Sequence, residues 1–223
     1  MHPTARRWLV GALSGAILTA ADPGRTGLVV NPGVDTVVPQ VVDGAGWSTS
    51  FYLMNLEPGK TIFWHLKFYS DSGGGMVLPL LGTGPAATVF ASLPPQWSVV
   101  IETPGTATAL QQGWASVVTL DRSADQPGAV VTNDRIGGLA TFRQRVPGRP
   151  DFEAVVPFSP SSENRFVMPF DNRAGFSTGI AWLNPDFNVV APVEVTIRNA
   201  EGVILRQETL NLLPGSKLVF SMP

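Results

Sequence analysis

The chain has 223 residues, of which 44% are hydrophobic and 14% charged, and its formal net charge is −2. This length suits one large or two small domains with cores of their own, and the apolar content excludes a disordered protein. The low charge excludes the basic surface that nucleic-acid binding needs, and the absence of cysteine excludes disulfides and a thiol nucleophile.

Residues 1–21 have the pattern of a signal peptide. Arg6 and Arg7 precede the apolar run Trp8–Leu18, and the small residues Thr19–Ala21 follow it. The run is shorter than the roughly 20 apolar residues of a membrane-spanning helix, so no stable span is expected once the leader is removed. An ordinary buried helix is the alternative interpretation. We predict a secreted, periplasmic or cell-surface protein, with residues 22–35 as a polar linker.

Residues 36–158 are predicted to form a first β unit. Glycine (23 residues) and proline (20 residues) separate short apolar runs, which is typical of an antiparallel β-sandwich or barrel. In one run Ile62, Trp64, Leu66 and Phe68 recur at every second position and so share one strand face, with His65 and Lys67 on the opposite face. The predicted strands are Thr36–Val42, Trp47–Met54, Thr61–Tyr69, Met76–Leu81, Ala87–Phe90, Trp97–Glu102, Gln112–Thr119, Gly137–Arg145 and Phe152–Phe158.

Residues 159–164 have a linker-like composition, and residues 165–223 are predicted to form a second, shorter β unit. No window after the leader has convincing helical periodicity. The strands expected in the second unit are Phe166–Met168, Phe176–Leu183, Val193–Arg198, Val203–Leu212 and Lys217–Met222.

The two units share an internal repeat. Gly46–Asn55 recurs 129 positions later as Gly175–Asn184, with the same glycine, serine, threonine and asparagine at four places. A shift of 120 positions then aligns Leu93–Val100 with Leu213–Phe220. We interpret the chain as two copies of one β unit, in which about three strands of the first copy have no counterpart in the second.

A second copy without those strands would expose sheet edges and apolar core. Three explanations are compatible with the sequence. The chain is a fragment of a longer product, or the second copy packs on the first, or a strand from a partner completes it. We favour packing on the first copy, with self-association or a protein partner at the β edges as the alternative.

We assign no catalytic residue and no cofactor. A Ser-His-Asp triad would have to use His65, which we interpret as a half-exposed strand residue. Asp151 and Glu153 share a strand face, whereas the carboxylates of a glycosidase usually come from different strands across a cleft. We therefore interpret this pair as a solvated face.

We assign no metal site either. Zinc sites built from His and Cys are excluded by the scarcity of both residues. Asp121, Asp125 and Asp134 lie in one loop with Asn133, but their spacing matches no calcium loop known to us, so we interpret this segment as a soluble loop.

A group of arginines could bind an acidic glycan or the carboxylates of a partner. We interpret it instead as a charged face that keeps a sheet soluble. The residues are Arg135, Arg143, Arg145 and Arg149.

Two tryptophans are candidate ligand-binding residues. Trp97 and Trp114 each follow a turn, so either ring could lie at the rim of a sandwich and stack on a sugar. Core or edge packing is the simpler interpretation, because tryptophan is usually largely buried. A row of exposed rings would favour a carbohydrate-binding module.

The Gly46–Asn55 pattern, with the later segments Gly113–Val117 and Gly138–Arg143, resembles secreted bacterial Ig-like β-sandwich repeat domains of surface proteins. The resemblance covers about residues 36–223 and carries no catalytic residues. It implies two tandem Ig-like antiparallel sandwich units, the second truncated or packed with the first, in a non-enzymatic structural or adhesive protein of the cell surface. A carbohydrate-binding module is the alternative, and a glycoside hydrolase a more distant one.

Overall fold

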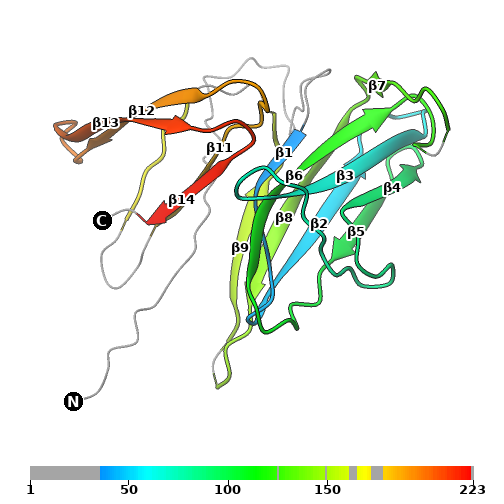
Figure 1. Cartoon of the computed structure of the whole chain (residues 1–223), viewed down its shortest axis with the longest axis horizontal. Helices are drawn as coiled ribbons and strands as arrows, with labels where there is room; N and C mark the ends of the chain where they lie inside the picture. The colour runs from blue at the N-terminus through cyan, green and yellow to red at the C-terminus, as the bar shows by residue number, and fades with distance from the viewer. Residues whose placement is uncertain (1–35, 125, 149, 161–164, 172–177, 222–223) are drawn as a thin grey trace.

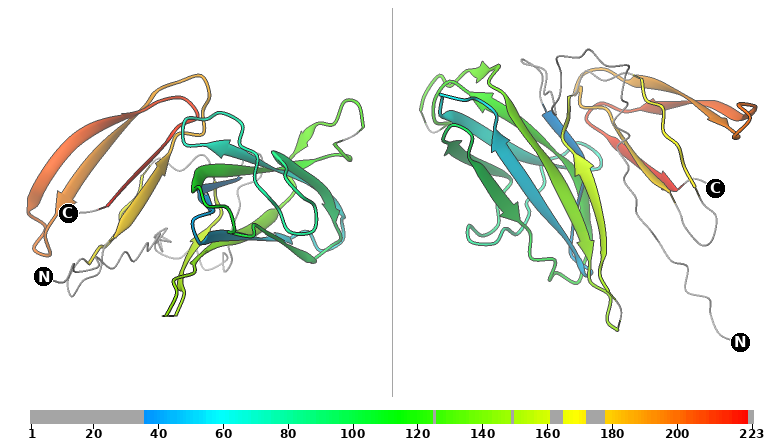
Figure 2. Two further views of the ribbon diagram at one scale, coloured as in Figure 1. Left: turned by 60° about the horizontal axis from the view of Figure 1, so that its bottom comes forward. Right: turned by 180° about the vertical axis from the view of Figure 1, so that it is seen from behind.

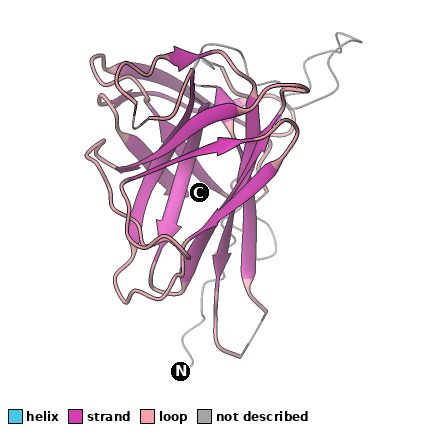
Figure 3. Ribbon diagram, turned by 90° about the vertical axis from the view of Figure 1, so that its right-hand side faces the viewer, coloured by secondary structure: helices cyan, strands magenta, loops and turns pink. Residues whose placement is uncertain are grey.

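A computed structural model describes residues 36–124, 126–148, 150–160, 165–171 and 178–221. Every regular element among them is a β-strand, and every strand pairing is antiparallel (Figure 3). The predicted all-β class is therefore confirmed. The predicted leader, residues 1–21, and the linker, residues 22–35, lie outside the described residues.

The largest sheet, called sheet A here, has the strand order β10-β1-β6-β3-β4, with β7 paired to β6 (Figure 1). Between Val38 and Val41 the register of β1 against β6 shifts, close to Pro39. The shift agrees with the bulge or edge position expected for a proline in a strand. The strands of sheet A are β1 (Thr36–Asp43), β3 (Ile62–Ser70), β4 (Thr88–Leu93), β6 (Gln111–Leu120), β7 (Val131–Thr132) and β10 (Ser159–Pro160).

A second sheet, called sheet B, has the order β5-β2-β8-β9. Its strands are β2 (Trp47–Asn55), β5 (Ser98–Glu102), β8 (Ile136–Gln144) and β9 (Phe152–Pro157). Side chains from both sheets form one apolar core, in which Trp64 and Phe68 of sheet A join Phe51 and Phe142 of sheet B. The period-two pattern of β3 places its apolar residues in this core, as expected from strand geometry.

Four further strands form two separate antiparallel pairs, β12 with the next strand β13 and, enclosing them in sequence, β11 with β14. They are β11 (Gly179–Leu183), β12 (Ala191–Arg198), β13 (Ile204–Leu212) and β14 (Lys217–Ser221). These four strands lie to one side of sheets A and B, and the β12–β13 pair projects away from the rest of the strands (Figure 2).

Three segments differ from the predicted elements. Met76–Leu81 is irregular except for one bridge between Leu78 and Ala86, and the side chains of Met76, Leu78 and Leu80 fill the core while Val77 and Leu81 are exposed. Phe166–Met168 forms no strand, and Phe166 is largely exposed. Ser159–Pro160, assigned to the linker, pairs with Thr36 and Val37 as β10.

Candidate functional site

The sequence repeat corresponds to a repeat of strand pairing. Phe51 of β2 faces Ile101 of β5, and 129 positions after Phe51, Ile180 of β11 faces Phe220 of β14. The counterpart of Ile101 is thus 119 positions later, and the shift of 120 that aligned Leu93 with Leu213 is wrong by one residue. The two shifts differ because the first copy has a ten-residue insertion between β3 and β4, in the segment that holds Met76–Leu81. We call β2–β5 the first strand set and β11–β14 the second strand set.

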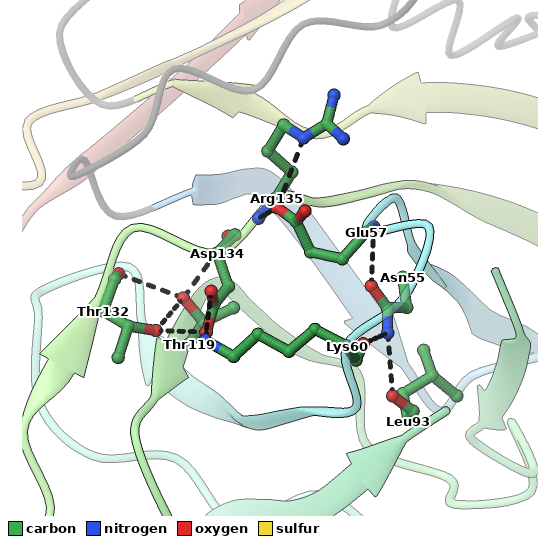
Figure 4. A network of polar contacts seen from close by, with 8 residues as sticks. All are labelled: Asn55, Glu57, Lys60, Leu93, Thr119, Thr132, Asp134 and Arg135. Carbon is green, nitrogen blue, oxygen red and sulfur yellow. Dashed lines mark hydrogen bonds and ion pairs between the residues drawn. The ribbon is translucent and has the colours of Figure 1, made fainter. Parts of the chain in front are cut away.

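One buried asparagine holds the same turn in each set. The side-chain amide nitrogen of Asn55 donates to the carbonyl oxygens of Lys60, Leu93 and Pro94, and its oxygen accepts from the backbone N–H of Glu57. Figure 4 shows Asn55 among these partners. An asparagine is suited to this position because it combines donors and an acceptor in one short side chain.

Asn184 repeats the arrangement in the second set. Its amide nitrogen donates to the carbonyls of Val189, Leu212 and Leu213, and its oxygen accepts from the N–H of Asp186. The identical asparagine in the two sequence copies therefore serves the same structural purpose in both. Sequence comparison shows that the residue recurs but not which bonds it makes.

The second set packs on sheet A through a buried lysine. The side chain of Lys217 is fully buried, and its Nζ lies 2.6 Å from Gln40 Oε1, 2.7 Å from the Gly113 carbonyl oxygen and 2.9 Å from Asp71 Oδ1. The ammonium group donates hydrogen bonds to Gln40 and Gly113, and the contact with the Asp71 carboxylate is an ion pair that supplies the opposite charge. Burial lowers the pKa of Lys217 below its ordinary value, and the interaction with Asp71 opposes that shift.

Aromatic side chains surround this lysine contact. Trp114 of β6 stacks on Tyr69 of β3 with ring centroids 4.2 Å apart, and Phe187 of the second set lies 5.3 Å from Tyr69 and 5.8 Å from Trp114. The indole N–H of Trp114 donates to the carbonyl of Gly215. A side chain at Gly215 would meet the Phe187 ring at 2.7 Å, so glycine permits this close approach. The second set is therefore docked by specific contacts.

Docking does not give the second set the neighbours that the first set has. In the first set β3 lies between β4 and β6, and β2 lies between β5 and β8. Among the described residues, the counterparts β12 and β11 pair only with β13 and β14. The edge of β12 that corresponds to the β6 side of β3, and the edge of β11 that corresponds to the β8 side of β2, therefore have no paired strand among the described residues.

The missing neighbours also leave the apolar face of the second set partly open to solvent. Phe51, Leu53, Trp64, Leu66 and Phe68 of the first set are 0–1% exposed. Their counterparts are only half-buried; they are Ile180, Trp182, Val193, Val195 and Ile197. This half-covered face and the open edge of β12 are the candidate functional site.

His65 and the acidic pair lie on different sheets, His65 on β3 of sheet A and Glu153 on β9 of sheet B. The ring of His65 lies on the outer face of β3, edge-on to Phe90 at 5.7 Å, and burial together with Lys67 lowers its pKa to about 4. Glu153 forms an exposed ion pair with Arg143 at 2.9 Å, while Asp151 is exposed. Of the remaining arginines, Arg135 binds Glu57, the backbone N–H of Arg145 donates to Gly46, and Arg149 lies outside the described residues.

The acidic loop residues have separate partners. Asp134 accepts from Lys60 at 2.6 and 2.7 Å and from Thr132 at 2.8 Å, in the polar network of Figure 4. Asp121 binds Arg122 and the N–H of Val130, and these contacts, Arg122 first, lower its pKa. Asp125 lies outside the described residues. In the part of the chain that is described, no group of three or more His, Cys, Asp or Glu residues could hold a metal ion.

The network in Figure 4 instead joins two turns. Arg135, before β8, donates to Glu57 in the β2–β3 turn through its backbone N–H and its Nε, and the backbone bond is the main cause of the lowered pKa of Glu57. Lys60 and Asp134 make a second link between the same turns. The charged residues are therefore used to hold one end of the two sheets together.

The two candidate tryptophans lie in different environments. Trp97 is 64% exposed in the turn before β5, whereas Trp114 is 1% exposed in the contact with the second set. They therefore do not form a row of exposed rings. Ligand binding by Trp97 stays a prediction.

Sequence reasoning missed one Gly-x-Ser-x-Gly pattern, at residues 175–179 in the repeat. A hydrolase nucleophile elbow of this form follows a strand and begins a helix. Here Gly179 begins strand β11, and the corresponding residues of the first copy, 46–50, lead into β2. Ser177 lies outside the described residues. The pattern agrees with the strand repeat and carries no catalytic assignment.

Comparisons with known proteins give no further identification. Within the described part of the chain, no helix has the length and apolarity needed to cross a membrane. No protein family, curated protein or solved structure matches the sequence or the fold.

Proposed function

We propose that the chain is a non-enzymatic, exported structural protein, built from two Ig-like β-sandwich units, whose second unit makes contacts with other proteins. The observation that carries the proposal is the open edge of β12, whose counterpart β3 is paired on both sides. An open edge beside half-buried apolar side chains is a template for strand addition. The resemblance to secreted bacterial surface repeats agrees with this function and with a location outside the cytoplasm.

The charged side chains support a structural function. Glu57, Asp134 and Glu153 are paired with Arg135, Lys60 and Arg143, respectively. These pairs join turns or neighbouring strands. In addition, His65 has a pKa of about 4, far below the value near 7 that suits a general base at neutral pH.

A strand peptide tests the proposed function. In the first set β6 is the partner of β3, so a labelled peptide with the sequence of Gln111–Leu120 should add to β12. We expect binding by fluorescence anisotropy and slower hydrogen exchange at Val193–Ile197. A scrambled peptide is the control.

Two variants of the same strand sharpen the test. Val195→Lys places a charge on the inner face of the open edge and should abolish peptide binding. Thr196→Lys changes the exposed face and should reduce it much less. Protection, in the peptide-free monomer, of the β12 amides that point away from β13, or equal binding by both variants, would contradict the proposal.

A carbohydrate-binding module is the second candidate, because the ring of Trp97 is exposed. If it binds sugars, Trp97→Ala should lose retention on a polysaccharide affinity gel, while Trp114→Phe should not. Unchanged retention of Trp97→Ala would exclude that tryptophan as the sugar platform.

A further inference from the structure

The outward-facing residues of β12 are complementary to themselves. Glu194, Thr196 and Arg198 alternate with the half-buried Val193, Val195 and Ile197, and all three are exposed. Glu194 binds Gln207 of β13 through one carboxylate oxygen, and Arg198 donates through Nη1 to the Gly202 carbonyl oxygen. The second carboxylate oxygen of Glu194 and the other N–H groups of Arg198 remain able to pair. The acidic and basic residues thus stand symmetrically on either side of Thr196.

Strand geometry limits how two copies of β12 could pair. Directly opposed residues of an antiparallel pair point to the same side, so apolar residues must face apolar residues. Placing Thr196 opposite Thr196 of a second copy meets this condition. It also sets Glu194 opposite Arg198 twice, and Val195 opposite Ile197 twice. Moving the centre of pairing to Glu194 or Arg198 would set like charges opposite each other, which is unfavourable. Moving it to Val195 would keep apolar residues together but make no charge pair, because Glu194 would then face Thr196 and Arg198 would face Pro192.

We propose that two copies of the chain associate by antiparallel pairing of their β12 edges, with Thr196 on the twofold axis. The pairing would turn two separate β12–β13 hairpins into one four-stranded sheet and would cover Val195 and Ile197. The proposal rests on the proposed function and names the partner as a second copy.

The other edges of the second set are less suited to self-pairing. β13 is the counterpart of β4, which is also an edge strand in sheet A, so its open side is a regular feature of the fold. β11 has only five residues and lies beside β1. β12 has eight residues and is the counterpart of the interior strand β3, and within the described part of the chain only one of its two edges is paired.

The absence of native cysteine makes disulfide trapping a direct test. Opposed residues in an antiparallel pair have Cα atoms about 4.5–5.5 Å apart, within the range that a disulfide spans. Thr196→Cys should therefore give a cross-linked dimer under mild oxidation. Thr209→Cys, at an exposed position of neighbouring β13, is the matched control and should not.

Charge reversal tests the register independently. Glu194→Arg or Arg198→Glu alone sets like charges opposite and should weaken dimerisation about tenfold, as measured by sedimentation or light scattering. The double variant restores opposite charges and should restore the dimer. A mixture of the two single variants should form heterodimers, because each strand then carries one sign of charge.

The outcomes separate this inference from the proposed function. A monomer at all concentrations, equal trapping of both cysteine variants, or a double variant no better than the single ones would overturn β12 self-pairing. If the monomer still binds the Gln111–Leu120 peptide, the edge accepts a different strand and the proposed function stands. If the monomer does not bind the peptide, both β12 self-pairing and the proposed function are wrong.

Discussion

The two strand sets have the same pairing but very different burial. β2–β5 and β11–β14 share their register, two of their three connections and a buried asparagine, yet the apolar side chains of β2 and β3 are fully buried while those of their counterparts β11 and β12 are only half-buried. Pairing and turns depend on residues within each set. Burial depends on β1, β6, β8 and β9, which come from later or earlier parts of the chain. Strand pairing is therefore specified within each set, whereas full burial of the apolar face requires strands from other parts of the chain.

Truncating one apolar residue in each set should give the largest difference. Leu66→Ala empties a fully buried site and should lower the free energy of unfolding by about 2–5 kcal/mol. Val195→Ala at the counterpart position should cost about 1 kcal/mol or less, because the side chain is half-buried. Urea unfolding of both variants checks this, and equal losses would show that the second set is as well covered as the first.

The asparagines should instead behave alike. Asn55→Ala and Asn184→Ala each remove a donor for three carbonyls and an acceptor for one N–H, so each should cost about 2–3 kcal/mol. Denaturant unfolding followed by hydrogen exchange assigns the loss to each set. A much smaller effect at Asn184 would mean that its turn is solvated.

Lys217→Met should loosen the docking of the second set. The variant leaves the Gly113 carbonyl and Gln40 Oε1 without their donor, at a cost of about 1–3 kcal/mol. The pKa of Lys217 is lowered in the folded protein, so the unfolded chain binds more protons between that pKa and 10.5. Wild-type stability should therefore rise with pH in this window relative to the variant. Parallel pH profiles would contradict the buried cation.

The smallest effect is expected at His65. Its pKa is about 4 in the folded protein and about 6.5 when unfolded, so the unfolded state binds more protons between these values. Stability should fall as the pH drops from 6.5 to 4, by about 1–2 kcal/mol after solvent screening of a half-buried ring. His65→Gln should lose this component, which thermal unfolding at several pH values would reveal.

The local features were predictable and the distant contacts were not. Alternation identifies the buried face of β3, and the recurrence of Asn55 at Asn184 marks the repeat, because both depend on neighbouring residues. The acceptor Gln40 lies 177 positions from Lys217, and a lysine in a short strand is normally solvent-facing. The apolar pattern of Met76–Leu81 predicts a strand, but the segment is irregular and contributes Met76, Leu78 and Leu80 to the core.

The docking contact has a consequence for the order of folding. On the side of sheet A, the docking contact is made by Gln40 on β1 and by Gly113 and Trp114 on β6. These two strands pair only after a long loop closes. Loop closure of this kind is slow compared with hairpin formation. The β12–β13 hairpin can therefore form early, but the second set has no surface to dock on until sheet A has assembled. Trp114 contacts Phe187 of the second set and is 1% exposed in the folded protein, so a change in its fluorescence should report the docking step.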